Sequence, residues 1–131
     1  MKGKINSAKE AVPTKGEMEV LQVLWQHGPS TVRFVHESLN EQKEAVQYTS
    51  TLKLMQVMTE KGLLQRDETN MKHVYSAGLE EDKTKKAMLE RFVTSIYNGS
   101  PSSLMLALLD DKTSKEELQK IKELLNQMEN E

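Results

Sequence analysis

The sequence predicts a mainly α-helical chain with one small β-hairpin, an α+β fold. Helical apolar spacing recurs along most of the 131 residues, and polar breaks with Gly or Pro divide it into segments. Only the stretch after Gly62 is typical of two short strands around a polar turn. An amphipathic helix that begins at Tyr48 directly precedes this hairpin, and that order indicates the winged variant of the helix-turn-helix motif.

Composition narrows the class of protein. The chain has no cysteine, which excludes disulfides and thiolate metal sites and suits a reducing cytoplasm. No apolar run approaches membrane-spanning length and the N-terminus lacks the apolar stretch of a signal peptide. We therefore expect a cytoplasmic protein without membrane insertion. A hydrophobic fraction of 37% supports a real core.

The N-terminal part is expected to divide into a flexible basic arm at residues 1–12 and a winged-helix domain at residues 13–78. Thr14 and Glu17 have the spacing of a capping box, which predicts the start of the first helix. Gly28-Pro29 is expected to end that helix.

A second helix follows, with Ser30 or Thr31 as its cap and a polar connector at residues 40–47 behind it. Its apolar spacing predicts one buried and one solvent-facing side. The inner side carries Val32, Val35 and Leu39, and the outer side carries Arg33, His36 and Glu37.

The third helix is expected from Tyr48 to Lys61, and it also has two faces. Its inner face carries Thr51, Leu54, Met55 and Met58, and its outer face carries Thr49, Ser50, Leu52, Lys53 and Gln56. A strand to Asp67, a turn at residues 68–71 and a returning strand at residues 72–77 then form the wing.

Residues 79–131 are expected to form a helical dimerisation domain. Three helices are predicted there, the second beginning at Ser100-Pro101 and the third at a capping box that opens with Ser114. So short a unit buries little apolar surface alone, and its wide apolar stripes favour a symmetric homodimer over packing against the N-terminal domain. The predicted interface comprises Phe92, Ile96, Leu104, Met105, Leu108, Leu109, Leu118, Ile121 and Leu125.

The predicted partner is double-stranded DNA, read by the third helix in the major groove. The net charge of −2 argues weakly against this partner, but residues 1–78 hold ten Lys or Arg against nine Asp or Glu. Two joined copies would double the phosphate contacts and predict a two-fold symmetric site. The predicted contacts are Thr49, Ser50, Leu52 and Lys53 on the helix, Tyr48 before it, Thr31 and Arg33 on the second helix, and Arg66, Lys72 and His73 near the wing.

Six segments, taken in order, resemble the penicillinase-repressor (BlaI/MecI/CopY) family of winged-helix transcriptional regulators. The segments are PTKGEMEVLQVLW at 13–25, GPSTVR at 28–33, VHE at 35–37, YTSTL at 48–52, EKGLL at 60–64 and YNGSPSSL at 97–104. The resemblance implies a bacterial cytoplasmic homodimer that binds a palindromic operator, often of TACA/TGTA type, and represses transcription. It also implies that Thr49, Ser50, Leu52 and Lys53 face the DNA.

The same resemblance bears on regulation. Antibiotic-responsive members are inactivated by a sensor-linked protease that cuts an Asn–Phe bond, and Ala107-Leu108 stands at the matching place. That replacement puts this mode of control in doubt. Copper-responsive members sense metal through cysteines, which this chain lacks. The wing turn at residues 68–72 also departs from the shorter family turn.

The sequence offers three alternative functions. An enzyme is disfavoured, because His27, His36 and His73 fall in different elements without a nucleophile or metal-ligand companion. A winged-helix protein-interaction module without DNA binding is the main alternative. A small-molecule sensor is the third, with a pocket lined by methionines, although core packing is the favoured role of these side chains. The methionines concerned are Met55, Met58, Met88 and Met105. No cofactor and no metal site is predicted.

Overall fold

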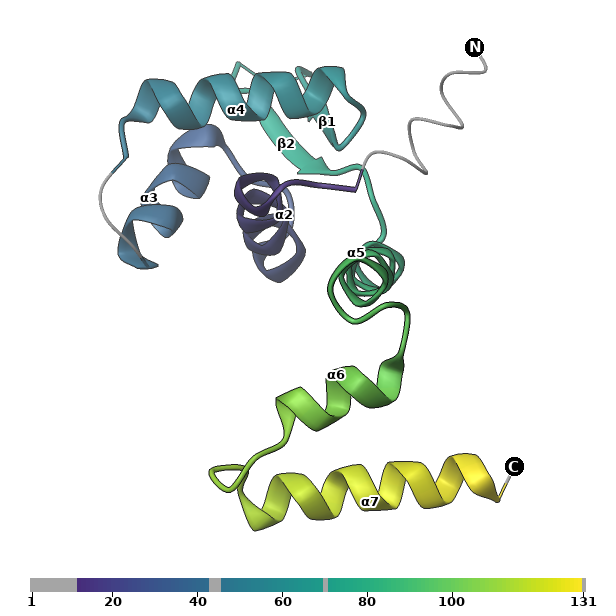
Figure 1. Cartoon of the computed structure of the whole chain (residues 1–131). Helices are drawn as coiled ribbons and strands as arrows, with labels where there is room; N and C mark the ends of the chain where they lie inside the picture. The colour runs from purple at the N-terminus through teal and green to yellow at the C-terminus, as the bar shows by residue number, and fades with distance from the viewer. Residues whose placement is uncertain (1–11, 43–45, 70, 131) are drawn as a thin grey trace. The chain divides into compact units, whose positions relative to one another are not determined.

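The computed structural model describes residues 12–42, 46–69 and 71–130. Within these ranges the chain forms six helices and one two-stranded antiparallel sheet (Figure 1), which confirms the predicted fold class. The expected basic arm lies outside the described residues, except for Val12.

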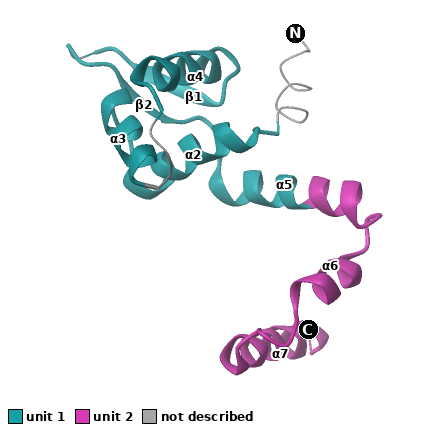
Figure 2. Cartoon of the chain, turned by 60° about the vertical axis from the view of Figure 1, so that its left-hand side comes forward, with its two compact units in different colours: residues 1–89 teal, residues 90–131 magenta. Residues whose placement is uncertain are grey.

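The chain divides into two compact units, Met1–Leu89 and Glu90–Glu131 (Figure 2). The division falls inside helix α5 (Glu81–Ile96). The functional domain limits at residues 13–78 and 79–131 stay predictions.

Helix α2 (Lys15–His27) begins at the predicted capping box. Glu17 N–H donates to Thr14 Oγ1 at 3.2 Å, and Thr14 N–H donates to Glu17 Oε1 at 3.0 Å. The helix ends at Gly28, whose φ of 83° suits a residue without a side chain.

Helix α3 (Val32–Gln42) begins after Thr31, whose Oγ1 accepts the N–H of Phe34 at 3.2 Å. The helix continues through residues 40–42, so the predicted connector at 40–47 starts too early. The reason is that Asn40 keeps helical geometry while its side chain satisfies polar partners, one of them His36 one turn earlier.

Helix α4 (Tyr48–Glu60) has the expected limits, with Gln47 in the N-cap position. Strands β1 (Leu64–Asp67) and β2 (Val74–Ala77) pair antiparallel, with Arg66 opposite Tyr75. The returning strand therefore starts two residues later than predicted. The Asp67 carboxylate accepts the N–H of Thr69 at 2.9 Å and turns the chain out of the ladder.

Ser30 joins the other edge of β2. Ser30 N–H donates to Tyr75 O at 2.9 Å, and Tyr75 N–H donates to Ser30 O at 2.8 Å. The turn between α2 and α3 is thus hydrogen-bonded to the wing.

A tight crossing fixes the far end of the hairpin. A Cβ atom at Gly78 would lie 2.7 Å from the carbonyl oxygen of Gly62, closer than side chains allow. Gly62 itself has φ of 87°. The exit from α4 and the exit from β2 therefore meet through two glycines.

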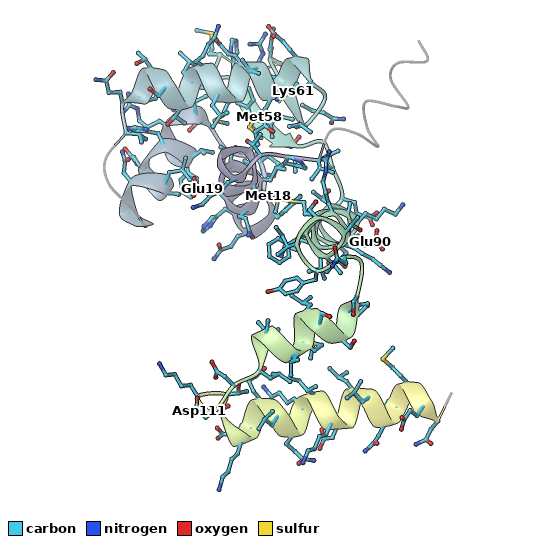
Figure 3. The ribbon with its side chains drawn as sticks, viewed as in Figure 1. Met18, Glu19, Met58, Lys61, Glu90 and Asp111 are labelled. Carbon is cyan, nitrogen blue, oxygen red and sulfur yellow. The ribbon has the colours of Figure 1, made fainter. Side chains whose placement is uncertain are left out.

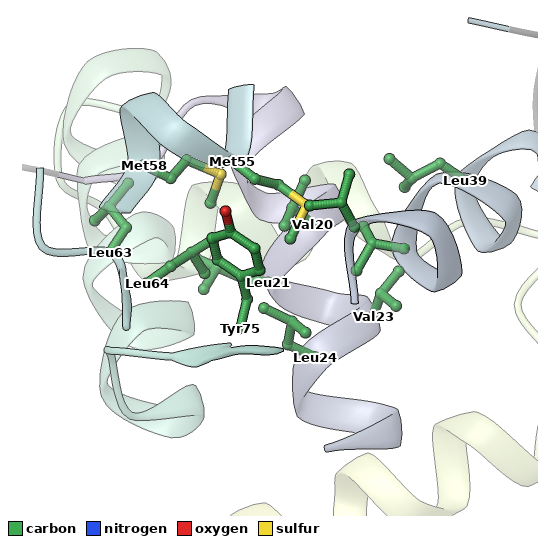
Figure 4. Close-up of a cluster of buried hydrophobic side chains, with 12 residues drawn as sticks. Val20, Leu21, Val23, Leu24, Leu39, Met55, Met58, Leu63, Leu64 and Tyr75 are labelled. Atoms are coloured by element: carbon green, nitrogen blue, oxygen red, sulfur yellow. The ribbon is translucent and has the colours of Figure 1, made fainter. Parts of the chain in front are cut away.

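The core of the first unit lies between α2, α3, α4 and the hairpin (Figure 4). The Tyr75 ring, 2% exposed, lies among methionine and leucine side chains of the other elements. Trp25 adds a contact outside this core, since its Nε1–H donates to Leu79 O at 3.1 Å. The core residues are Val20, Leu21, Val23, Leu24, Val32, Val35, Leu39, Met55, Met58, Leu63, Leu64 and Tyr75.

The second unit contains the end of α5, helix α6 (Pro101–Leu108) and helix α7 (Lys115–Glu129). Ser100 caps α6 by accepting Ser103 N–H, and Ser114 caps α7 by accepting Glu117 N–H. Neither helix has a buried residue.

Candidate nucleic-acid interface

Helix α4 carries a polar face that is open to solvent. Thr49, Ser50 and Lys53 are exposed there, as predicted from the helical period. Side chains project from α4 on the face turned away from α2 (Figure 3). A helix of 13 residues that is free along one side has the shape required to enter a major groove.

Leu52 differs from the prediction that it lies on the outer face. Its side chain is half-buried and packs partly against the core. The reason is that this side of the first turns of α4 packs against the core of the first unit. Leu52 therefore lies at the edge of the exposed face and lines a groove beside it.

That groove, here called the wing groove, has a volume of about 540 Å³ and runs between the start of α3, the start of α4 and the wing. It brings together six of the predicted contacts, whereas Thr49, Ser50, Lys53 and Arg66 do not line it. Its lining residues are Thr31, Val32, Arg33, Phe34, Glu37, Tyr48, Leu52, Met71, Lys72, His73 and Tyr75.

Aromatic rings order the polar side chains of the wing groove. The Arg33 guanidinium carbon lies 4.9 Å from the centre of the Tyr48 ring, a cation–π contact. The Tyr48 ring meets the His36 ring edge-on, with 5.4 Å between centres. Arg33 is thereby held at the mouth of the groove with its charge exposed, which suits a contact with a phosphate.

Two apolar side chains at the wing groove were not among the predicted contacts. Phe34 is 40% exposed and Met71 fully exposed. A large apolar residue on the outer side of α3 and another in a polar turn are the sequence signals that could have indicated them.

His36 contradicts the prediction that it faces outward. The residue is half-buried, and its Nδ1 lies 3.0 Å from Thr51 Oγ1. Thr51, predicted on the inner face of α4, is 2% exposed and provides the polar partner that draws the imidazole inward.

Arg66 lies on β1 and is already paired, since it forms an ion pair with Glu68. Hydrogen bonding to Tyr75 and the charge of Glu68 raise the pKa of Arg66. A hydrogen bond from Thr69 lowers the pKa of the neighbouring Asp67. Lys72 and His73 are exposed before β2. Of the three predicted wing contacts, Arg66 is thus the one that must exchange a partner to reach a phosphate.

A buried carboxylate fixes the opposite end of α4. Glu17 is 4% exposed, and Lys61 Nζ lies 2.7 Å from its Oε2 (Figure 3 labels Lys61). Burial alone would raise the pKa of Glu17, but hydrogen bonds from Lys61 and Thr14 outweigh it and lower the pKa below its ordinary value. This pair joins the start of α2 to the end of α4.

The predicted dimerisation residues lie in α5, α6 and α7 or directly after α6. Phe92, Ile96, Leu108 and Leu125 have exposed side chains, between 48% and 62%. The others are half-buried: Leu104, Met105, Leu109, Leu118 and Ile121.

The four methionines of the predicted pocket differ in their surroundings. Met55 and Met58 are fully buried in the core of the first unit, and Met88 and Met105 are half-buried. Among the residues described, no three His, Asp or Glu side chains gather closely enough to hold a metal ion. No helix in the described ranges combines the length and the apolar character needed to cross a membrane.

Comparison with known proteins adds the family. A protein-family profile described as penicillinase repressor matches residues 13–127. The chain is 25% identical over 115 residues to a penicillinase repressor of Bacillus licheniformis, covering 87% of this chain and 89% of that protein. It is 24% identical over 114 residues to the methicillin resistance regulatory protein MecI of Staphylococcus aureus (strain N315), covering 86% and 92%.

A solved structure has a related fold. It is that of a MarR family protein from Bacillus stearothermophilus, with a TM-score of 0.53, 17% sequence identity, and coverage of 98% of this chain and 85% of that chain. The likeness supports the winged-helix fold alone. The profile match spans nearly the whole chain, and the chain therefore belongs to the penicillinase repressor family, whose members are winged-helix regulators that repress transcription and are not enzymes.

Proposed function

We propose that two copies of this chain bind a palindromic DNA operator and repress transcription from it. The observation that carries the proposal is the open polar face of α4 beside the wing groove, where Arg33, Lys72 and His73 meet. Base contacts would come from α4 and phosphate contacts from the groove. By family resemblance, we expect a TACA/TGTA-like operator.

The reading residues have separate tasks. Lys53 is exposed and can donate to guanine N7 and O6 or to a phosphate. The hydroxyls of Thr49 and Ser50 can donate to base edges or to phosphates. The edge position of Leu52 leaves part of its side chain available for a thymine methyl group.

The second unit supports the homodimer. Leu106 is 82% exposed, Leu108 62% and Met128 70% in the single chain. Apolar side chains exposed in such number on helices without a buried residue are typical of an interface. A two-fold axis would place the two α4 helices at half-sites about one helical turn apart.

Footprinting on the DNA upstream of the chain's own gene tests the proposal. We expect a protected region with two-fold symmetry, and an affinity that falls steeply with salt because phosphate binding releases counterions. An asymmetric or absent footprint, or a flat salt dependence, would favour the protein-interaction module instead.

Lys53→Ala is the sharpest variant for the reading face. It should weaken operator binding by about tenfold, because a charged donor to DNA is lost without any loss of core contacts. Lys83→Ala is the matched control, since Lys83 is also exposed on a helix of the same unit but lies outside the proposed interface. Equal affinities of the two variants would contradict the placement of Lys53.

A sensor-linked protease stays a predicted partner. The residues matching the family's cleaved bond, Ala107 and Leu108, are exposed in the last turn of α6. Incubation of the chain with a membrane metalloprotease encoded beside its gene would test this partner: cleavage would support it, and an intact chain would contradict it.

A further inference from the structure

A chain of hydrogen bonds joins α3 to the beginning of α4. Val46 N–H donates to Asn40 Oδ1 at 3.0 Å. Asn40 Nδ2 lies 3.0 Å from His36 Nε2, and His36 Nδ1 lies 3.0 Å from Thr51 Oγ1. We call these four residues the His36 chain. It connects α3 with both sides of the point where α4 begins.

The backbone N–H of Val46 determines which atoms of the His36 chain donate hydrogen bonds and which accept them. A backbone N–H can only donate, so the Asn40 atom that faces Val46 is the carbonyl oxygen. The Asn40 amino group then faces His36 Nε2, which must accept. The imidazole is therefore neutral, with its proton on Nδ1, from which it donates to Thr51 Oγ1.

We propose that His36 is a positioning residue for DNA binding, which holds α4 in its reading orientation only while the imidazole is neutral; this rests on the proposed function. A second proton on Nε2 would point at the Asn40 amino group. Turning that amide would instead point its amino group at Val46 N–H. One hydrogen bond of the His36 chain is lost in either case, at side chains that are half-buried.

The surroundings of His36 connect it to the wing groove. The titratable neighbours are Tyr48 of α4, which meets the imidazole edge-on, and Arg33 of α3, which lies over the Tyr48 ring. Glu37 follows His36 on α3 and is exposed. Because Tyr48 and Arg33 are both proposed DNA contacts, a change at the imidazole reaches the interface through direct ring contacts.

Operator affinity at two pH values tests the role of His36, with the duplex protected in the footprint as the probe. Between about pH 7.5 and 5.5, affinity of the unmodified chain should fall about tenfold more than affinity of His36→Gln. Glutamine offers one acceptor and one donor without titrating, so the affinity of this variant should depend less on pH than that of the unmodified chain. His27→Gln is the matched control, and its profile should follow that of the unmodified chain.

Asn40→Asp replaces the amide of the His36 chain by a carboxylate, which only accepts hydrogen bonds. A carboxylate accepts from Val46 N–H and also from a protonated Nε2, so the extra loss of affinity at low pH should disappear. In the unmodified chain without DNA, nitrogen NMR of the His36 imidazole should show the proton on Nδ1 at about pH 7.5. A proton on Nε2 there would overturn the proposal.

The outcomes separate the two proposals. Binding at about pH 7.5 with a pH profile equal to that of His36→Gln would overturn the role of His36 and leave the repressor function intact. No binding to any upstream duplex at about pH 7.5 would contradict the proposed function itself.

Discussion

The two units of the chain differ in how they use their apolar residues. The first unit gathers twelve buried hydrophobic side chains into one core. In the second, α6 and α7 have no buried residue, and Leu106, Leu108, Leu124 and Leu125 are among the exposed large hydrophobic side chains of the described residues. The first unit thus has a core of its own, whereas the second exposes apolar side chains, as expected if a second copy covers them in the proposed homodimer.

Similar apolar patterns in the two units therefore have different roles. Leu21 and Leu125 both occupy apolar positions of amphipathic helices, yet Leu21 is fully buried and Leu125 is 55% exposed. Mutations in the first unit should therefore change folding, and those in the second should change association.

The largest effect is expected at Leu108. Leu108→Asp would place a charge in the proposed apolar interface and raise the dimer dissociation constant more than about a hundredfold. Sedimentation velocity measures this change, and operator affinity should fall with it. Ser102→Asp adds the same charge at an exposed position of α6 and is the control. A dimer that survives Leu108→Asp would remove Leu108 from the interface.

Leu21→Ala should cost about 3 kcal/mol of unfolding free energy, because it empties a fully buried position in the core of the first unit. Urea unfolding followed by the fluorescence of Trp25, the single tryptophan, measures it. Leu125→Ala is the matched comparison, and its effect should depend on protein concentration. A loss of stability that depends on protein concentration in both variants would contradict the difference between the two units.

Gly78→Ala tests the crossing of the two chain exits. The added methyl group would press on the Gly62 carbonyl oxygen, and we expect a cost of about 2 kcal/mol from backbone displacement. Thermal unfolding measures the change. Gly16→Ala, at a position with open space around it, should not destabilise the chain. Equal stability of both variants would show that this contact is relaxed.

The smallest effect concerns pH. Because the pKa of Glu17 is lowered on folding from its ordinary value of 4.5, its stabilising contribution is present above that value and is lost as pH falls through the lowered pKa. Glu17→Gln should cost about 1 kcal/mol at neutral pH, and the cost should shrink below about pH 4.5. Urea unfolding at several pH values measures it. Glu60→Gln, at an exposed carboxylate of α4, is the control, and a parallel pH profile would contradict the assignment.

Local signals made most of the fold predictable. Thr14 and Glu17 set the start of α2, and Ser100 and Ser114 set the starts of α6 and α7, because caps act through neighbours in sequence. The helix end that was predicted wrongly depends on side-chain contacts that neighbouring sequence does not reveal. Asn40 extends α3 because His36 and Val46 satisfy its amide.

The part of the candidate site that depends only on which helix face is exposed could be predicted from the sequence. The helical period placed Thr49, Ser50 and Lys53 on an open face, as the structure does. Periodicity assigns a residue to a helix face but not to a partner on another helix, so it could not show that His36 pairs with Thr51, fifteen positions away. Nor could it show that Leu52 is half-buried against the core, because that packing depends on other elements of the fold.

The hydrogen bonds between Ser30 and Tyr75 have a consequence for recognition. They join the segment that leads into Thr31 and Arg33 to the strand that follows Lys72 and His73. In the proposed complex these groups contact the two sides of one phosphodiester path, and the hydrogen bonds would set their spacing before DNA binds. Preorganisation of this kind reduces the ordering entropy lost on association, so a nearly neutral surface needs fewer cations to bind.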